Sequence, residues 1–184
     1  ARPQGAKCDI GAYEAEPSVD DTPPVITPNI DGALGSNGWY KGNVTVSWSV
    51  TDAESAVTSV PCASTIISAD TPGQAVACSA TSAGGTGSET VTIKRDATAP
   101  ALAPAVAPSA VLLNGTATAT PNATDALSGV ATSSCGTPNT ATVGSKSVSC
   151  SAMDNAGNSA TASAAYAVAY QFVGFSGPVL GGGV

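Results

Sequence analysis

Residues 44–52 read Val44-Thr-Val-Ser-Trp-Ser-Val-Thr-Asp52, and the pattern returns at an offset of 73 as Ala117-Thr-Ala-Thr-Pro-Asn-Ala-Thr-Asp125. Farther along, Val76-Ala-Cys-Ser-Ala80 returns at an offset of 72 as Val148-Ser-Cys-Ser-Ala152. One deletion in the loop between the cysteines accounts for the different offsets. An internal repeat of this length, made of short strand-like stretches, suits a small β-sandwich. The sequence therefore predicts an all-β chain with two tandem Ig-like β-sandwich modules.

Alternation of apolar and polar residues supports this prediction. In the first stretch the apolar residues are Val44, Val46, Trp48 and Val50, and each is followed by Ser or Thr. A period of two places one set of side chains on one face of a strand, so Trp48 is expected to belong to the core. No segment shows a convincing helical period.

Proline-containing segments mark the module boundaries. Asp21-Thr-Pro-Pro24 precedes the first repeat, and Asp96-Ala-Thr-Ala-Pro100 precedes the second. Proline removes a backbone donor and stiffens a linker. We expect one module over residues 21–97 and another over residues 98–170. Residues 171–184 then form a tail or the start of a further module.

The cysteines fall into two similar pairs. Cys62 and Cys78 lie 16 residues apart, and Cys135 and Cys150 lie 15 apart. One disulfide in each module is expected, and with it an oxidising compartment. Free thiols or a zinc site are the alternatives, but zinc ligands usually include His or a short Cys-x-x-Cys spacing, and the chain has neither. Cys8 is left over, with an unidentified partner expected upstream of this sequence.

Composition excludes several classes of function. Charged residues make up 10% of the chain and the net charge is −7. Without a basic patch, binding to nucleic acid or to an anionic membrane surface is not expected. The sequence contains no apolar run of about 18 residues, so no membrane span is expected in this fragment.

Several short motifs resemble known modules. The D-x-T-x-P linkers, Gly38-Trp-Tyr40 and Asp154-Asn-Ala-Gly-Asn158 resemble bacterial Ig-like and hyalin-repeat (HYR) modules. The first repeat departs from the pattern, because Ser82-Ala-Gly-Gly-Thr86 stands where the second has residues 154–158. Residues 2–14, which contain Cys8-Asp-Ile-Gly-Ala-Tyr-Glu14, are similar to the closing segment of bacterial parallel β-helix surface domains. Residues 1–20 would then be the tail of such a domain plus a linker. The resemblance implies an extracellular chain, secreted or on a cell surface.

Polar residues near the predicted strand ends are the candidates for a catalytic or calcium-binding site. Catalysis is not expected, because the chain has no His, and Asp52, Glu54 and Asp125 are interpreted as acceptors in turns. A calcium site would draw on these candidate oxygen donors: Asp52, Asp125, Asp154, Asn155 and Asn158. Calcium takes six to eight oxygens, and the clustered carboxylates are too few. We therefore predict no resident metal and no cofactor, and interpret the Asn and Gly residues as turn formers.

The predicted function is that of a non-catalytic structural or adhesion stalk. Its expected partner is an unidentified cell-surface or matrix protein or glycan. The alternative is a glycan-binding accessory module of a β-helix carbohydrate-active enzyme, with Trp39 and Tyr40 as the candidate glycan contacts. Packing of these two rings against a neighbouring loop is the simpler interpretation.

Overall fold

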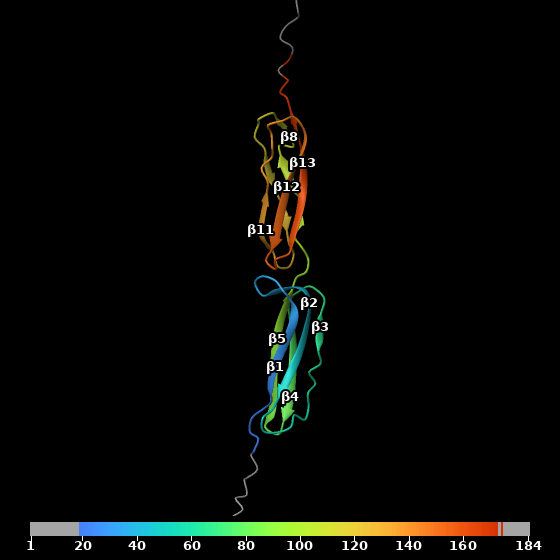
Figure 1. Ribbon diagram of the computed structural model, residues 1–184, viewed down its shortest axis with the longest axis vertical. Coiled ribbons are helices and arrows are strands. Elements are labelled where there is room, and N and C mark those ends of the chain that lie inside the picture. The colour runs from blue at the N-terminus through green and yellow to red at the C-terminus, as the bar shows by residue number, and fades with distance from the viewer. Residues whose placement is uncertain (1–18, 173, 175–184) are drawn as a thin grey trace, which may run out of the picture. The chain divides into compact units, whose positions relative to one another are not determined.

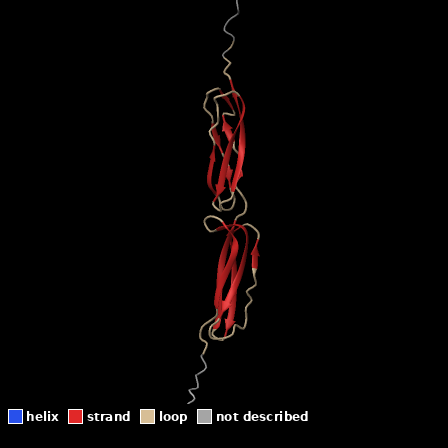
Figure 2. Cartoon of the chain, viewed as in Figure 1, coloured by secondary structure: helices blue, strands red, loops and turns tan. Residues whose placement is uncertain are grey.

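The computed structural model describes residues 19–172 and residue 174. These residues form strands and loops, with no helix among them, which confirms the all-β prediction (Figures 1 and 2). None of them belongs to a helix that could cross a membrane. Cys8, nearly all of the expected β-helix tail and most of residues 171–184 lie outside the described part of the chain.

Five strands come from the first repeat. They are β1 (Val25–Leu34), β2 (Trp39–Thr51), β3 (Thr65–Ile67), β4 (Thr71–Ser82) and β5 (Gly85–Arg95). They form one sheet of order β1-β2-β5-β4, and β3 pairs with β2. The strand β2 carries the alternating stretch found in the sequence. Val44 and Val46 are fully buried, and Trp48 and Val50 are half-buried, as the period of two predicts.

The second repeat supplies eight strands, of which β12 and β13 are the longest. They are β6 (Ala101–Leu102), β7 (Ala105–Ala107), β8 (Ala110–Leu112), β9 (Thr118–Thr120), β10 (Ala123–Thr124), β11 (Val130–Cys135), β12 (Gly144–Asp154) and β13 (Ser159–Ala169). The main sheet has the order β11-β12-β13-β8, and two-stranded sheets form from β7 with β9 and from β10 with β6.

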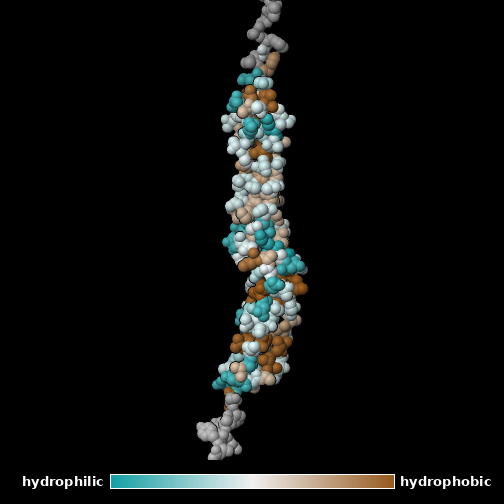
Figure 3. Space-filling model, in the orientation of Figure 1, coloured by the Kyte–Doolittle hydropathy of each residue, from teal (hydrophilic) through white to brown (hydrophobic). Residues whose placement is uncertain are grey.

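The core of the second repeat lies between two of these sheets. Val148, Ala164, Tyr166 and Val168 come from β12 and β13, and Val106 comes from β7. They form one buried cluster that also packs against the partly buried Ala119 of β9, so two sheets face each other as in a β-sandwich. The outward residues of β12 and β13 are mostly Ser, Thr and Ala, and much of the visible surface is accordingly of intermediate hydropathy (Figure 3).

A break divides the second copy of the alternating stretch. Where β2 runs without interruption, the second copy forms β9 and β10, which pair with different strands. Pro121 and Asn122 lie between them, and Asn122 has a φ of 44°. Proline cannot donate a ladder hydrogen bond, and a left-handed residue turns the chain out of the strand. The Trp48-to-Pro121 exchange thus replaces one long strand with two short ones.

The structure contains both expected disulfides, Cys62–Cys78 and Cys135–Cys150. Cys135 and Cys150 are direct partners in the antiparallel pairing of β11 with β12. This bond therefore joins neighbouring strands of one sheet, whereas the disulfide of antibody domains joins two sheets.

The described residues form two compact units. Unit 1 contains the described residues up to Ile30, together with Val46–Thr65 and Ala75–Val91. Unit 2 contains Asp31–Thr45, Ile66–Gln74 and the described residues from Thr92 onward. The division passes through all five strands of the first repeat, β1 to β5. The boundary expected from the linkers, at residues 97 and 98, stays a prediction.

We expect the second repeat, taken alone, to be less stable than the first. Val44 and Val46 are fully buried, whereas their counterparts Ala117 and Ala119 are smaller and only partly buried. Each Val-to-Ala exchange removes about 1.6 kcal/mol of hydrophobic stabilisation when the site is buried. Separate chains of residues 19–97 and 96–170 should therefore melt in that order, the second lower, when followed by circular dichroism. Equal or reversed midpoints would contradict this expectation.

Candidate functional site: two acidic turn clusters

Three carboxylates gather in each of the two units. Asp20, Asp52 and Glu54 form the first acidic cluster, and Asp96, Asp125 and Asp154 form the second. Within each cluster one oxygen from every residue lies within 4.8 Å of the others. The candidates named from the sequence are thus split, because Asp52 belongs to the first cluster and Asp125 and Asp154 belong to the second.

Asp20 and Asp96 were not among the sequence-based candidates. Both begin a D-x-T-x-P segment, with Thr22 and Thr98 in the third position. The backbone N–H of Thr22 donates to Asp20 Oδ1 at 3.1 Å, and that of Thr98 donates to Asp96 Oδ1 at 3.0 Å. Aligning these two segments, rather than starting the first at Asp21, would have identified the pair.

The second oxygen of each of these carboxylates binds the turn that follows the alternating stretch. Ser128 N–H donates to Asp96 Oδ2 at 3.1 Å. Ser55, which aligns with Ser128 at the offset of 73, donates its hydroxyl to Asp20 Oδ2. The Gly84 N–H adds a further donation to Asp20 Oδ2, at 2.7 Å. Each module entry is thereby attached to the same turn in its own repeat.

Asp52 and Asp125 organise those turns themselves. Asp52 Oδ1 accepts the backbone N–H groups of Glu54 and Ser55, both at 2.9 Å. Asp125 Oδ1 accepts the N–H groups of Leu127 at 3.2 Å and Gly129 at 2.6 Å. An Asp side chain that accepts N–H groups a few residues on is a common way to close a turn.

Asp154 performs a similar task in the turn between β12 and β13. Its side chain is buried, with 1% exposed. Oδ1 accepts the N–H groups of Gly157 at 2.7 Å and Asn158 at 2.8 Å. In the first repeat Ser82 takes this place and donates its hydroxyl to Asp20 Oδ2 at 3.2 Å. The departure from the repeat pattern at residues 82–86 thus replaces a carboxylate, which only accepts, with a hydroxyl that donates to Asp20 and also accepts the N–H of Gly84 at 3.2 Å.

The two Asn candidates act as donors. Asn155 Nδ2 donates to the carbonyl oxygens of Ser128 and Gly129, at 2.8 and 3.1 Å. Asn158 Nδ2 donates to the carbonyl of Asp96 at 3.0 Å and to Asp154 Oδ2 at 2.8 Å. Three carboxylates suit a hard cation in principle. In this arrangement, however, most of their oxygens already accept N–H groups, so the second cluster acts as a set of hydrogen-bond acceptors that joins three separate segments.

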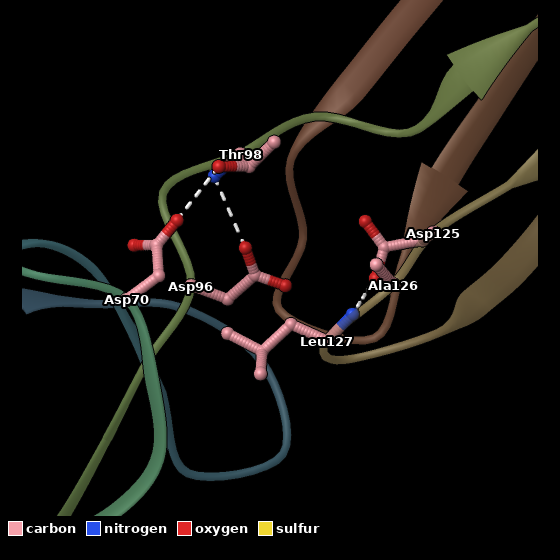
Figure 4. Close-up of a pocket in the computed structure, with 6 residues that line it drawn as sticks. All are labelled: Asp70, Asp96, Thr98, Asp125, Ala126 and Leu127. Atoms are coloured by element: carbon pink, nitrogen blue, oxygen red, sulfur yellow. Dashed lines mark hydrogen bonds between the residues drawn. The ribbon is translucent and has the colours of Figure 1, made fainter.

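A pocket of about 290 Å³ in unit 2 lies beside the second cluster. Its lining residues are Asp70, Asp96, Thr98, Asp125, Ala126 and Leu127 (Figure 4). Asp70, which directly precedes β4, contacts residues 95–98. It accepts the N–H of Ala97 at 3.0 Å and the hydroxyl of Thr98 at 2.6 Å, and it forms an ion pair with Arg95. Residues 95–98 are therefore fixed by side-chain contacts.

The glycan candidates do not form one flat surface. Trp39 and Tyr40 are both half-buried and follow each other in β2. Successive side chains of a strand point to opposite faces. Lys94 Nζ lies 5.3 Å from the centroid of the Trp39 ring, so a cation already contacts that ring.

Three carboxyl groups have pKa values below the ordinary 3.8. For Asp20 the main cause is the hydroxyl of Ser55, and for Asp52 it is the backbone N–H of Ser55. The pKa of Asp70 is lowered chiefly by the hydroxyl of Thr98, with help from the N–H of Ala97 and the charge of Arg95. These donors favour the ionised form of each carboxyl group.

Acid should therefore destabilise the protein. Because the folded pKa values lie below the unfolded value, stability is complete above the unfolded pKa of 3.8 and falls as pH drops through the folded values. Melting midpoints measured from about pH 5 to pH 2 should fall, and Asp70→Asn should flatten the curve. Asp31→Asn is the control, because the Asp31 side chain is exposed and makes no hydrogen bond within the described residues. A curve equally steep for Asp70→Asn would count against this assignment.

No family model matches the chain, and no curated protein matches it. Among solved structures, the chain is similar to fibronectin(III)-like modules of CbhA from Clostridium thermocellum. The sequence identity is 15%, the match covers 83% of this chain and 99% of that chain, and the TM-score is 0.31.

Proposed function

We propose that this chain is a non-catalytic spacer of an extracellular protein, built from tandem Ig-like modules over residues 21–97 and 98–170. It holds neighbouring parts of a larger secreted or surface protein apart. The two disulfides support an oxidising, extracellular location. The absence of His from the sequence supports a role without acid–base catalysis, because His is the commonest acid–base group near neutral pH.

The fixed linker is the observation that carries the proposal. Asp96 is fully buried, and its backbone N–H donates to the carbonyl of Tyr40 at 2.9 Å. Asp70 binds the linker from one segment, and Asn158 donates to the carbonyls of Asp96 and Thr98 from another. All of these residues belong to unit 2. A linker whose polar groups are satisfied in this way transmits force better than a flexible Gly- and Ser-rich tether.

Small-angle X-ray scattering of the chain tests the spacer. A compact globule of 184 residues would have a radius of gyration of about 16 Å. We expect a clearly larger value and a maximum dimension typical of an extended particle. Asp70→Asn should broaden the distribution of interatomic distances, because it weakens the hold on residues 95–98. A radius of gyration near that of a globule would overturn the proposal.

Calcium provides a second check on the same proposal. Without a resident metal, the melting midpoint should be unchanged by added Ca²⁺ or by a chelator. A ligand that binds only the native state raises the midpoint in proportion to its binding free energy. A clear Ca²⁺-dependent rise that is lost in Asp125→Asn would show that the second acidic cluster binds a cation and that the metal-free interpretation is wrong.

A further inference from the structure

The tip of the hairpin between β1 and β2 carries a reactive dipeptide. Asn37 and Gly38 have φ values of 54° and 75°, and the N–H of Trp39 donates to the carbonyl of Ser36 at 3.0 Å to close the turn. Asn37 is exposed, and its Nδ2 donates to the carbonyl of Asn155 at 3.0 Å. In an Asn-Gly sequence the glycine nitrogen has no side chain beside it, so it can approach the side-chain amide carbon of the asparagine.

Two local features favour that attack. Within the described residues, the N–H of Gly38 has no hydrogen-bond acceptor. In addition, Lys94 Nζ donates to the carbonyl oxygen of Asn37 at 3.2 Å and is held over the ring of Trp39. The Asn37 carbonyl and the Gly38 nitrogen share one conjugated peptide group. An ammonium group on the oxygen therefore favours loss of the proton from the Gly38 nitrogen.

A second Asn-Gly pair provides an internal comparison. Asn114 also has a left-handed φ, of 60°, and is exposed. The N–H of Gly115, however, donates to the carbonyl of Leu112 at 2.7 Å. Within the described part of the chain, no side chain donates to the Asn114 carbonyl. The nitrogen that would attack is therefore already engaged, and no cation activates it.

We propose that Asn37-Gly38 is a site of spontaneous self-modification that Lys94 promotes. The Gly38 nitrogen loses its proton and bonds to Cγ of Asn37, and the Cγ–Nδ2 bond breaks so that Nδ2 leaves as ammonia. Water then adds to one carbonyl of the resulting cyclic imide and breaks its bond to the ring nitrogen. The product is aspartate or isoaspartate at position 37. The new carboxylate cannot donate to the Asn155 carbonyl, so the reaction removes the Asn37–Asn155 hydrogen bond of unit 2.

Incubation of the full chain in mildly alkaline buffer, followed by peptide mapping and isoaspartate analysis, tests the proposal. In the unmodified sequence Asn37 should react faster than Asn114, a comparison that needs no variant. Lys94→Gln should slow the reaction at Asn37 by about tenfold and leave Asn114 unchanged, because it removes a charge-assisted hydrogen bond. Lys94→Arg should keep most of the rate at Asn37.

Two results would overturn the proposal as a whole, and a third would overturn the role of the Lys94 charge. One is a reaction at Asn114 as fast as at Asn37 in the unmodified chain. The other is an unchanged Asn37 rate in Lys94→Gln when the melting midpoint of that variant shows that it is folded. A reduced Asn37 rate in Lys94→Arg equal to that in Lys94→Gln would show that packing over Trp39, and not the charge, controls the reaction, and would also reject the role given to Lys94.

Discussion

Asp154→Ala should lower the free energy of unfolding by about 3 kcal/mol relative to Asp154→Asn, which is about 6–12 °C in melting midpoint for a chain of this size. Both variants remove the same negative charge. They differ because an amide oxygen can still accept the N–H groups of Gly157 and Asn158. Alanine leaves the N–H of Asn158 without its side-chain acceptor and leaves the N–H of Gly157 only the backbone carbonyl of residue 154, at 3.2 Å. Chemical denaturation of the two proteins at neutral pH provides the measurement.

Comparison with the unmodified chain separates the charge from the hydrogen bonds. Asp154 lies with Asp96 and Asp125, and like charges at this separation repel one another. Asp154→Asn removes this repulsion, but its single amide oxygen cannot replace both carboxylate oxygens, and the acceptor of Asn158 Nδ2 is lost. Asp154→Asn should therefore be less stable than the unmodified chain and more stable than Asp154→Ala. If Asp154→Asn were as unstable as Asp154→Ala, the carboxylate charge itself would be required, and hydrogen bonding alone would not explain the turn.

Removing the Cys135–Cys150 disulfide by replacing both residues with alanine should cost about 3 kcal/mol, the value expected for a loop of 15 residues. The bond connects β11, an edge strand, to β12. Its loss should therefore be seen first as faster amide exchange in β11, ahead of global unfolding. Hydrogen exchange followed by mass spectrometry distinguishes local opening of β11 from global unfolding.

The Cys62–Cys78 bond is the matched control, because its sequence separation of 16 predicts almost the same entropic effect. Replacement of that pair should leave exchange in β11 unchanged. Peptide mapping without reducing agent should first recover both pairs from the unmodified protein. Free thiols at the four positions, or a loss of protection in β11 when the Cys62–Cys78 pair is replaced, would contradict the assignment.

The internal repeat allowed the fold class to be predicted from the sequence, and individual residues show which structural details could not be predicted. The alternation over residues 44–50 predicted which side chains are buried, because the period of a strand is a local property. The sequence also shows Pro121, but it does not show that the strand divides into β9 and β10 there. The partners of these two strands are set by contacts that the local pattern does not contain.

The acidic clusters were only partly predictable for the same reason. Asp125 and Asp154 were named from the sequence because each stands in a recognisable turn. Asp96 stands in a segment that the sequence predicts to be a linker, and only the folded chain brings it to the other two. Likewise, the sequence names Asn155 and Asn158 as oxygen donors, whereas in the structure their Nδ2 atoms bind carbonyl oxygens. Which end of an amide is used depends on neighbours that are distant in sequence.

The attachment of Asp20 and Asp96 to their own repeats has a consequence for gene duplication. Each of these residues stands ahead of its repeat, yet its carboxylate binds the turn after that repeat's alternating stretch. A crossover just before either aspartate would copy a repeat together with its own acceptor. A crossover a few codons later would separate the aspartate from the turn that donates to it. In a copy of the second repeat, the backbone N–H of Ser128 would then have lost its acceptor. When recombination adds further repeats to the gene, the crossover points that persist should therefore lie immediately before the aspartate codon.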